Sequence, residues 1–267
     1  MLLNCDMGES FGAWQMGNDA AVMPYIDMAN IACGFHAGSP AIMAETVALA
    51  KQHQVLIGAH PAYPDLEGFG RRSMSFQQSE LAAILTYQIG AMEAICAQQG
   101  ETLAYVKPHG ALYNDKQSQP HLFETVVQVL AERNRHRQQP LRLMTLAPLV
   151  SAANTAATWQ QQLAHRYGVP LWFEAFADRR YEANGQLRAR RHADAVLQTS
   201  AEILSQAQAL AQQHPINASD GSSIQLQADT LCVHGDNAES IATVAAIRKA
   251  LTEITRSTTG TTAVKPQ

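Results

Sequence analysis

Several patterns that would assign this 267-residue chain to a broad class of protein are missing from it. The four cysteines form no CxxC pair, and a chain of this length can bury a core without disulfide staples, so we expect reduced thiols. The first residues, MLLNCDMGES, lack the basic and then apolar segments of a secretory signal. No apolar stretch approaches the ~18 residues that span a bilayer. These absences predict a cytoplasmic protein.

The chain also has few charged residues and no recognisable nucleotide-binding loop. Charged residues make up 16% of the chain, the formal net charge is −4, and the basic residues are scattered. This pattern indicates neither a nucleic-acid surface nor a membrane surface. No GxGxxG or P-loop motif follows an apolar run, which disfavours an open nucleotide-binding sheet, and there is no HExxH motif.

The chain does contain a regular alternation of short apolar runs and helical stripes. The runs end in Gly, Pro or Asp and are typical of strands buried on both faces. Seven such alternations predict a parallel sheet with helical crossovers, either open and doubly wound or closed into a barrel. The runs cover residues 2–6, 25–33, 55–60, 102–108, 141–147, 171–177 and 230–236, and the stripes cover 81–95, 123–130, 196–210 and 241–251.

We expect one domain, because no stretch rich in Pro, Gly, Ser or charge resembles a linker. Residues 1–256 would form it. The polar segment 257–267 would be a flexible tail. Ser39 and Pro40 predict the start of a helix, since Ser can cap and Pro fits the first turn.

Residues capable of chemistry gather where the apolar runs end. In parallel β/α folds, ligands bind at the carboxyl ends of the strands. A single histidine in such a place is more often structural, but four of the ten histidines in the chain lie there, beside acids and a lysine, which indicates an active site. The candidates are Asp6, Glu9, His36, His60, Lys107, His109, Glu174, Arg179, His234 and Asp236.

Some of these residues have alternative roles. Glu174 could form a structural salt bridge with Arg179 or Arg180. The loops 61–72 and 178–192 carry arginines that could bind carboxylate or phosphate, or could be solvated surface. The cysteines within the runs, Cys5, Cys33 and Cys232, are expected to pack in the core.

A metal ion is a further alternative, which we favour less. Asp6, His36 and His60 could ligate Zn, Mn or Fe. Without a metal, the same side chains form an acid/base and oxyanion-stabilising set, because histidine titrates near neutrality and lysine can stabilise developing negative charge.

Six motifs resemble the LamB/YcsF family, which is the family of the prokaryotic 5-oxoprolinase A subunits. They run in order along nearly the whole chain, with small departures at Cys5 and Ser39 that do not affect the candidate site. The motifs are NCDMGESFG (4–12), NIACGFHAGSP (30–40), GAHPAYPDLEGFGRR (58–72), VKPHGALYN (106–114), EAFADRRY (174–181) and CVHGD (232–236).

The resemblance implies a seven-stranded (β/α) barrel akin to the glycoside hydrolase/deacetylase barrels. It also implies an enzyme component that opens 5-oxo-L-proline to L-glutamate, coupled to the hydrolysis of ATP, with Mg²⁺ accompanying the nucleotide. The resemblance further implies two partner proteins, subunits B and C, and it is compatible with a homo-oligomer of this chain.

On these expectations each part of the site has a role. Asp6 or His60 would be the base, Lys107 and His109 would stabilise the oxyanion or phosphate, and Arg71 or Arg72 would hold the substrate carboxylate. Two other functions stay open: a metal-dependent amide or N-acyl hydrolase, and a subunit that binds substrate for chemistry on its partners. Whether ATP binds this chain or the partners is also open.

Overall fold

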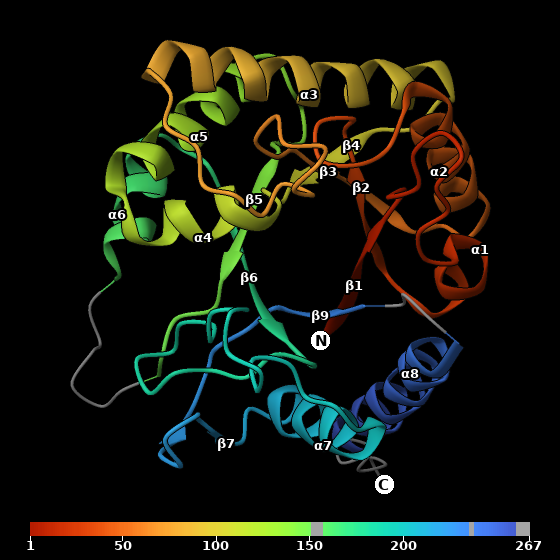
Figure 1. Cartoon of the computed structure of the whole chain (residues 1–267), viewed down its shortest axis with the longest axis vertical. Helices are drawn as coiled ribbons and strands as arrows, with labels where there is room; N and C mark the ends of the chain where they lie inside the picture. Colours follow the sequence, from red (N-terminus) through yellow and green to blue (C-terminus); the bar gives the residue numbers. More distant parts are fainter. Residues whose placement is uncertain (151–156, 235–237, 260–267) are drawn as a thin grey trace, which may run out of the picture.

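Seven parallel strands close into a barrel in the computed structural model, which describes residues 1–150, 157–234 and 238–259 (Figure 1). The barrel order follows the sequence, and β9 pairs with both β6 and β1 to close it. This confirms the seven-stranded (β/α) barrel and excludes the open sheet. The strands are β1 (Leu2–Met7), β2 (Met28–Ala32), β3 (Leu56–His60), β4 (Leu103–Val106), β5 (Arg142–Leu146), β6 (Leu171–Phe176) and β9 (Thr230–Val233).

Most strands are shorter than their apolar runs, and for two of them the local reason is clear. The run 25–33 loses its start, because Pro24 lies in the short 3-10 helix η1 (Met23–Tyr25) and β2 begins only at Met28. The run 102–108 ends as a strand at Val106, since Pro108 has no amide to donate. The backbone stays close to β3 nevertheless: Lys107 N donates to Ala59 O at 2.9 Å, and His109 N donates to Pro61 O at 2.8 Å.

The main helices surround the barrel where the stripes predict them (Figure 1). Ser39 Oγ accepts from Ile42 N at 3.3 Å and caps the first of them, as expected. Val196 is the exception, because it precedes its helix and forms a β-bridge with Arg179 instead. These helices are α2 (Pro40–Gln52), α3 (Gln78–Gln98), α5 (Pro120–Asn134), α7 (Ser200–Ala211) and α8 (Ala238–Thr259).

Short elements that the sequence pattern does not predict complete the described fold. Each is too short to show a long apolar stripe, and α4 follows β4 directly and shares its motif. They are the helices α1 (Asp19–Val22), α4 (Gly110–Ser118) and α6 (Trp159–Arg166), with the hairpin of β7 (Ile216–Asn217) and β8 (Ser223–Ile224).

Helix α3 corrects one expectation from the sequence. Its 21 residues are long and apolar enough to cross a membrane by length and composition, although no such stretch was expected. One face is buried through Leu81, Leu85, Ile89 and Met92, as in the core helix of a globular protein. The Gln88 amide on that face bonds the backbone of Ala62 in both directions, which fixes the helix to the loop after β3.

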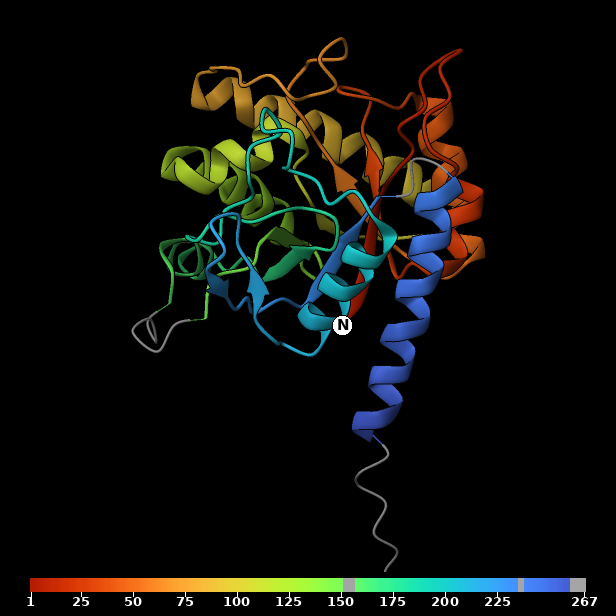
Figure 2. The ribbon, with the colours of Figure 1, turned by 60° about the horizontal axis from the view of Figure 1, so that its bottom comes forward.

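The last helix projects beyond the barrel (Figure 2). Val244, Ile247 and Leu251 of α8 are buried, whereas Thr252 and Glu253 are exposed. The helix continues to Thr259, so the expected boundary of the tail at 257 falls inside it, and residues 260–267 lie outside the described part.

A glycine shapes the barrel interior below the site. Gly58 of β3 faces the ring of Tyr105 on β4, and a Cβ on Gly58 would lie 2.2 Å from that ring. The space allows the Tyr105 hydroxyl to donate to Asn30 Oδ1 at 2.8 Å. The glycine therefore lets a buried tyrosine support the polar layer above it.

Candidate active site

A pocket of about 810 Å³ opens at the carboxyl ends of the strands. Its walls include Asp6 near the end of β1, His60 at the end of β3, Lys107 and His109 after β4, and His234 after β9. This volume lies within the range of small-molecule sites. The strand-end arrangement predicted from the sequence thus brings these side chains together around one cavity.

Lys107 lies at the centre of the charged network. Its Nζ is 3.0 Å from Asp6 Oδ1 and 3.0 Å from Glu174 Oε2. Burial alone would lower the pKa of Lys107, but the two carboxylates raise it well above the ordinary value. The lysine is therefore a fixed cation at neutral pH. Glu174 pairs with Lys107, a residue of the site, and the alternative pairing with Arg179 or Arg180 is not seen among the described residues.

Asp6 is held in one orientation by neutral and charged donors. Asn30 Nδ2 donates to Asp6 Oδ1 at 2.8 Å, and Lys107 Nζ approaches the same oxygen. The other oxygen, Oδ2, is 3.2 Å from His60 Nε2. Burial would raise the pKa of Asp6, but His60 and Lys107 hold it well below the usual range. Asp6 is therefore ionised at neutral pH.

Two backbone carbonyls fix the rings of His60 and His109. The Lys107 carbonyl lies 2.6 Å from His60 Nδ1, and the Phe69 carbonyl lies 3.0 Å from His109 Nε2. Because a carbonyl oxygen can only accept, those two nitrogens carry the protons. The remaining nitrogens, His60 Nε2 and His109 Nδ1, face each other at 2.9 Å.

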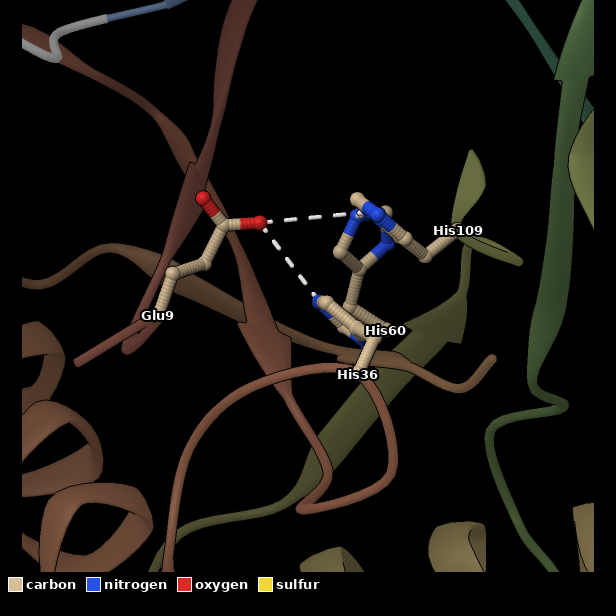
Figure 3. Close-up of side chains that lie close together, drawn as sticks. All are labelled: Glu9, His36, His60 and His109. Atoms are coloured by element: carbon tan, nitrogen blue, oxygen red, sulfur yellow. Dashed lines mark hydrogen bonds and ion pairs between the residues drawn. The ribbon is translucent and has the colours of Figure 1, made fainter. Parts of the chain in front are cut away.

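His36 and Glu9 complete a group that we name the histidine cluster: Glu9, His36, His60 and His109 (Figure 3). One ligand atom from each lies within 4.8 Å of all the others. His36 Nε2 is 3.5 Å from Glu9 Oε1, and His109 Nδ1 is 3.9 Å from it. Among the described residues, this is the group whose ligand atoms are close enough to hold a metal ion. It differs from the set expected from the sequence, because it contains Glu9 and His109 in place of Asp6.

Burial sets the charge of the cluster. It lowers the pKa of His36 and of His109 well below the ordinary value, and neighbouring imidazoles act in the same direction, so both rings are neutral. Burial and the nearby Asp6 raise the pKa of Glu9 to about 7. The cluster therefore offers the neutral imidazoles of His36 and His109 beside a carboxyl group that titrates near neutrality.

His234 forms a separate ion pair on the other side of Asp6. Its Nδ1 lies 2.5 Å from Asp178 Oδ2, and its Nε2 lies 3.9 Å from Asp6 Oδ2. Burial would lower the pKa of His234, but Asp178 raises it to about 9. His234 therefore adds a second positive charge beside Asp6 at neutral pH.

The arginines divide between the pocket and the surface. Arg71 lines the pocket and lies over the Phe69 ring, with 5.0 Å between its Cζ and the ring centroid. Arg72 does not line the pocket and pairs with Asp65 instead. Arg179 lines the pocket and donates to the Arg188 carbonyl at 2.7 Å, which ties down the loop 178–192. That loop also contributes Arg188, Arg190 and Arg191 to the wall.

The other candidates lie behind the wall or outside the described residues. His36 and Glu174 are buried and do not line the pocket, but His36 contacts Glu9 and Glu174 contacts Lys107, which do. Asp236 lies in the segment 235–237, which the described part of the chain does not include.

Sequence reasoning missed the residues that orient the site. Asn30 and Phe69 have no titratable group, although both lie inside the quoted motifs. Asp178 follows β6 and is a strand-end acid like the other candidates, but it was not among the predicted site residues. Cys232 is buried as expected of a core residue, but its Sγ lies 3.2 Å from Lys107 Nζ. The alternation of polar residues Asn4 and Asp6 along β1 was the available signal for the inner polar layer.

The fold and the pocket define a seven-stranded β/α-barrel protein with an enzyme-like site at the strand ends. Residues 1–265 match the LamB/YcsF family. The chain belongs to this family.

Relatives and a solved structure agree over nearly the whole length. The A subunit of 5-oxoprolinase from Pseudomonas fluorescens (strain Pf0-1) is 55% identical over 253 residues, covering 95% of this chain and 97% of that protein. The protein of the same name from Vibrio cholerae (strain M66-2) is 52% identical over 251 residues, with 94% and 97% covered. The lactam utilization protein from Thermus thermophilus superimposes with a TM-score of 0.83 at 35% identity, with 96% and 97% covered.

Proposed function

We propose that this chain is a component of an ATP-dependent 5-oxoprolinase, which opens 5-oxo-L-proline to L-glutamate and releases ADP and phosphate. The names of the relatives suggest the substrate. The observation that carries a chemical role for this chain is the buried Lys107, which lies between two carboxylates at the wall of the pocket. Simple capture of a ligand would not need this set of charges.

The lactam and its carboxylate match two parts of the pocket. Arg71 is a cation on the wall beside Phe69, and its planar fork suits a carboxylate. The apolar ring of the substrate can pack on Phe69 and Phe176, which also line the pocket. The lactam carbonyl would then point toward Lys107 and His234.

ATP would supply the driving force, because an unstrained five-membered lactam resists water. The lactam oxygen attacks the γ-phosphorus and ADP leaves. Water adds to the activated carbon, and the C–N bond breaks as the nitrogen gains a proton. A second water then attacks the resulting acyl phosphate at carbon and releases phosphate. Two waters, one ATP and one lactam give glutamate, ADP and phosphate.

The residues divide this work by charge. Asp6 is ionised and accepts the proton of the attacking water at Oδ2, with His60 beside it. Lys107 and the protonated His234 stabilise negative charge on the oxygen in a buried setting, where such stabilisation is strong. His109 is neutral and positions His60, so its role is less direct than the expected one.

The nucleotide would bind at the arginine side of the pocket. Arg179, Arg190 and Arg191 line that side and could bind the phosphates, with Mg²⁺. Subunits B and C would complete the enzyme.

The test uses the purified chain with and without subunits B and C. We expect glutamate release only with ATP and the partners, and its loss in Asp6→Asn. Label from the lactam oxygen should appear in inorganic phosphate. Unlabelled phosphate would reject phosphorylation of the lactam oxygen, and glutamate release without ATP would favour the metal-dependent hydrolase instead.

A further inference from the structure

We propose that the histidine cluster binds one divalent transition-metal ion at the floor of the pocket. Such a site shares residues with the active site of the proposed function, but metal binding is measured without turnover and is therefore tested separately. The orientation of the imidazole nitrogens, the unbonded buried atoms and the shape of the cluster support it.

The carbonyl contacts fix which nitrogens face the centre of the cluster. His60 Nδ1 and His109 Nε2 donate to the carbonyls of Lys107 and Phe69, so His60 Nε2 and His109 Nδ1 face each other at 2.9 Å. These are the two nitrogens that are left to bind an ion. Metal-binding histidines commonly donate their second nitrogen to a carbonyl in this way, which fixes the ring toward the ion.

His36 and Glu9 supply the unbonded atoms. His36 is 1% exposed, and among the described residues neither of its ring nitrogens makes a hydrogen bond. Glu9 Oε1 is buried and also makes none within that part of the chain. Buried polar groups are rarely left unbonded, because the lost hydration is costly. A metal bonded to His36 Nε2 and Glu9 Oε1 would satisfy both residues at the face where they meet.

The dimensions fit an ion after a small contraction. The four ligand atoms lie within 4.8 Å of one another, whereas bonds of about 2.0–2.1 Å to zinc bring ligand atoms somewhat closer. The His36 and His109 rings stack with centroids 3.8 Å apart, so metal binding must turn one ring away from the other. Three imidazole nitrogens and one carboxylate oxygen suit Zn²⁺, Co²⁺, Mn²⁺ or Fe²⁺, and the absence of thiolate from the set disfavours softer metals.

The cluster is open to substrate on one side. Glu9, His60 and His109 line the pocket, while His36 lies behind them. A bound ion could therefore take a water or a carbonyl oxygen as a further ligand, with Asp6 Oδ2 next to His60 Nε2 at 3.2 Å. The chemistry it adds is polarisation of that oxygen.

The experiment measures metal content and affinity in the full chain. The protein is stripped with a chelator and titrated with Zn²⁺ or Co²⁺, and the bound ion is quantified by mass spectrometry and, for Co²⁺, by visible absorption. We expect one ion per chain. His36→Gln, His109→Gln and Glu9→Gln should each weaken binding by about ten-fold or more. The matched control is His165→Gln, on the exposed surface of α6, which should bind as the wild type does.

Folding and stray binding are separated in the same experiment. Circular dichroism and thermal unfolding of the stripped proteins identify folded variants, and Glu9→Gln keeps the side-chain size if a histidine variant fails to fold. Metal should raise the unfolding temperature of the wild type and of His165→Gln only. No stoichiometric ion in the folded wild type would overturn the proposal, as would equal affinity in wild type and the folded cluster variants.

Discussion

Removing the charge of Lys107 is the sharpest perturbation of the site. In Lys107→Met the stem is kept and the ammonium is lost, which leaves Asp6 and Glu174 without their shared cation. The Glu174 side chain is fully buried and that of Asp6 is 11% exposed, so neither can regain much hydration. Breaking a buried ion pair from one side costs about 3–5 kcal/mol, and we expect a loss of this size in the free energy of unfolding.

The double variant Lys107→Met/Glu174→Gln separates stability from chemistry. Removing the second buried charge should restore roughly 2 kcal/mol of the loss, because no unpaired carboxylate is left at position 174. Glutamate release should stay undetectable, since the cation is still missing. The control Lys51→Met removes a half-exposed lysine that pairs with Glu101, and it should change stability by less than about 1 kcal/mol.

Urea unfolding and glutamate release with the partner subunits check both parts. Near-normal glutamate release by Lys107→Met would refute a chemical role for the lysine. A stability loss equal to that of Lys51→Met would refute the buried network as described.

Three further perturbations follow from the geometry. Because the pKa of His234 is raised to about 9, its pair with Asp178 stabilises the fold fully below about pH 6.5, and this stabilisation, on the order of 3 kcal/mol, is lost as the pH rises through about 9. Asp178→Asn should remove this pH dependence of the free energy of unfolding in urea, and an unchanged pH profile would contradict the assignment. Arg71→Met should raise the KM for 5-oxo-L-proline by about ten-fold or more, while Arg72→Met leaves it within about two-fold, and equal effects would reject the assignment. Gly58→Ala should destabilise the fold by about 1–3 kcal/mol, measured by thermal unfolding, and a neutral result would show that the facing ring can move.

The barrel was predictable because each of its strands is a short apolar run followed by Gly, Pro or Asp. Seven runs correspond to seven strands, and the resemblance decided between the open and closed sheets. The hairpin of β7 and β8 could not be found in this way, since two-residue strands carry no periodicity. The start of β2 was placed too early, because Pro24 lies in the short 3-10 helix before the strand and the apolar pattern alone does not reveal that helix.

The site was predictable where the position of a residue along a strand determines the face on which its side chain lies. Lys107 and His109 share a face because the extended backbone alternates, and the structure places both in the pocket wall. Loop residues were not predictable in the same way: Arg71 and Arg72 are adjacent and chemically equal, and the contact of Arg72 with Asp65 separates them. The pairing of Glu174 with Lys107 joins β6 to the residue that follows β4, and no local pattern relates these two positions.

The central claim is that this chain carries chemistry and does not merely hold substrate. The most direct measurement is a single-turnover assay of glutamate release from 5-oxo-L-proline, with ATP and both partner subunits, comparing the wild type with folded Asp6→Asn. We predict release by the wild type and a loss of about a hundred-fold or more in the variant, because the proton acceptor is gone. Undiminished release by Asp6→Asn would contradict that claim.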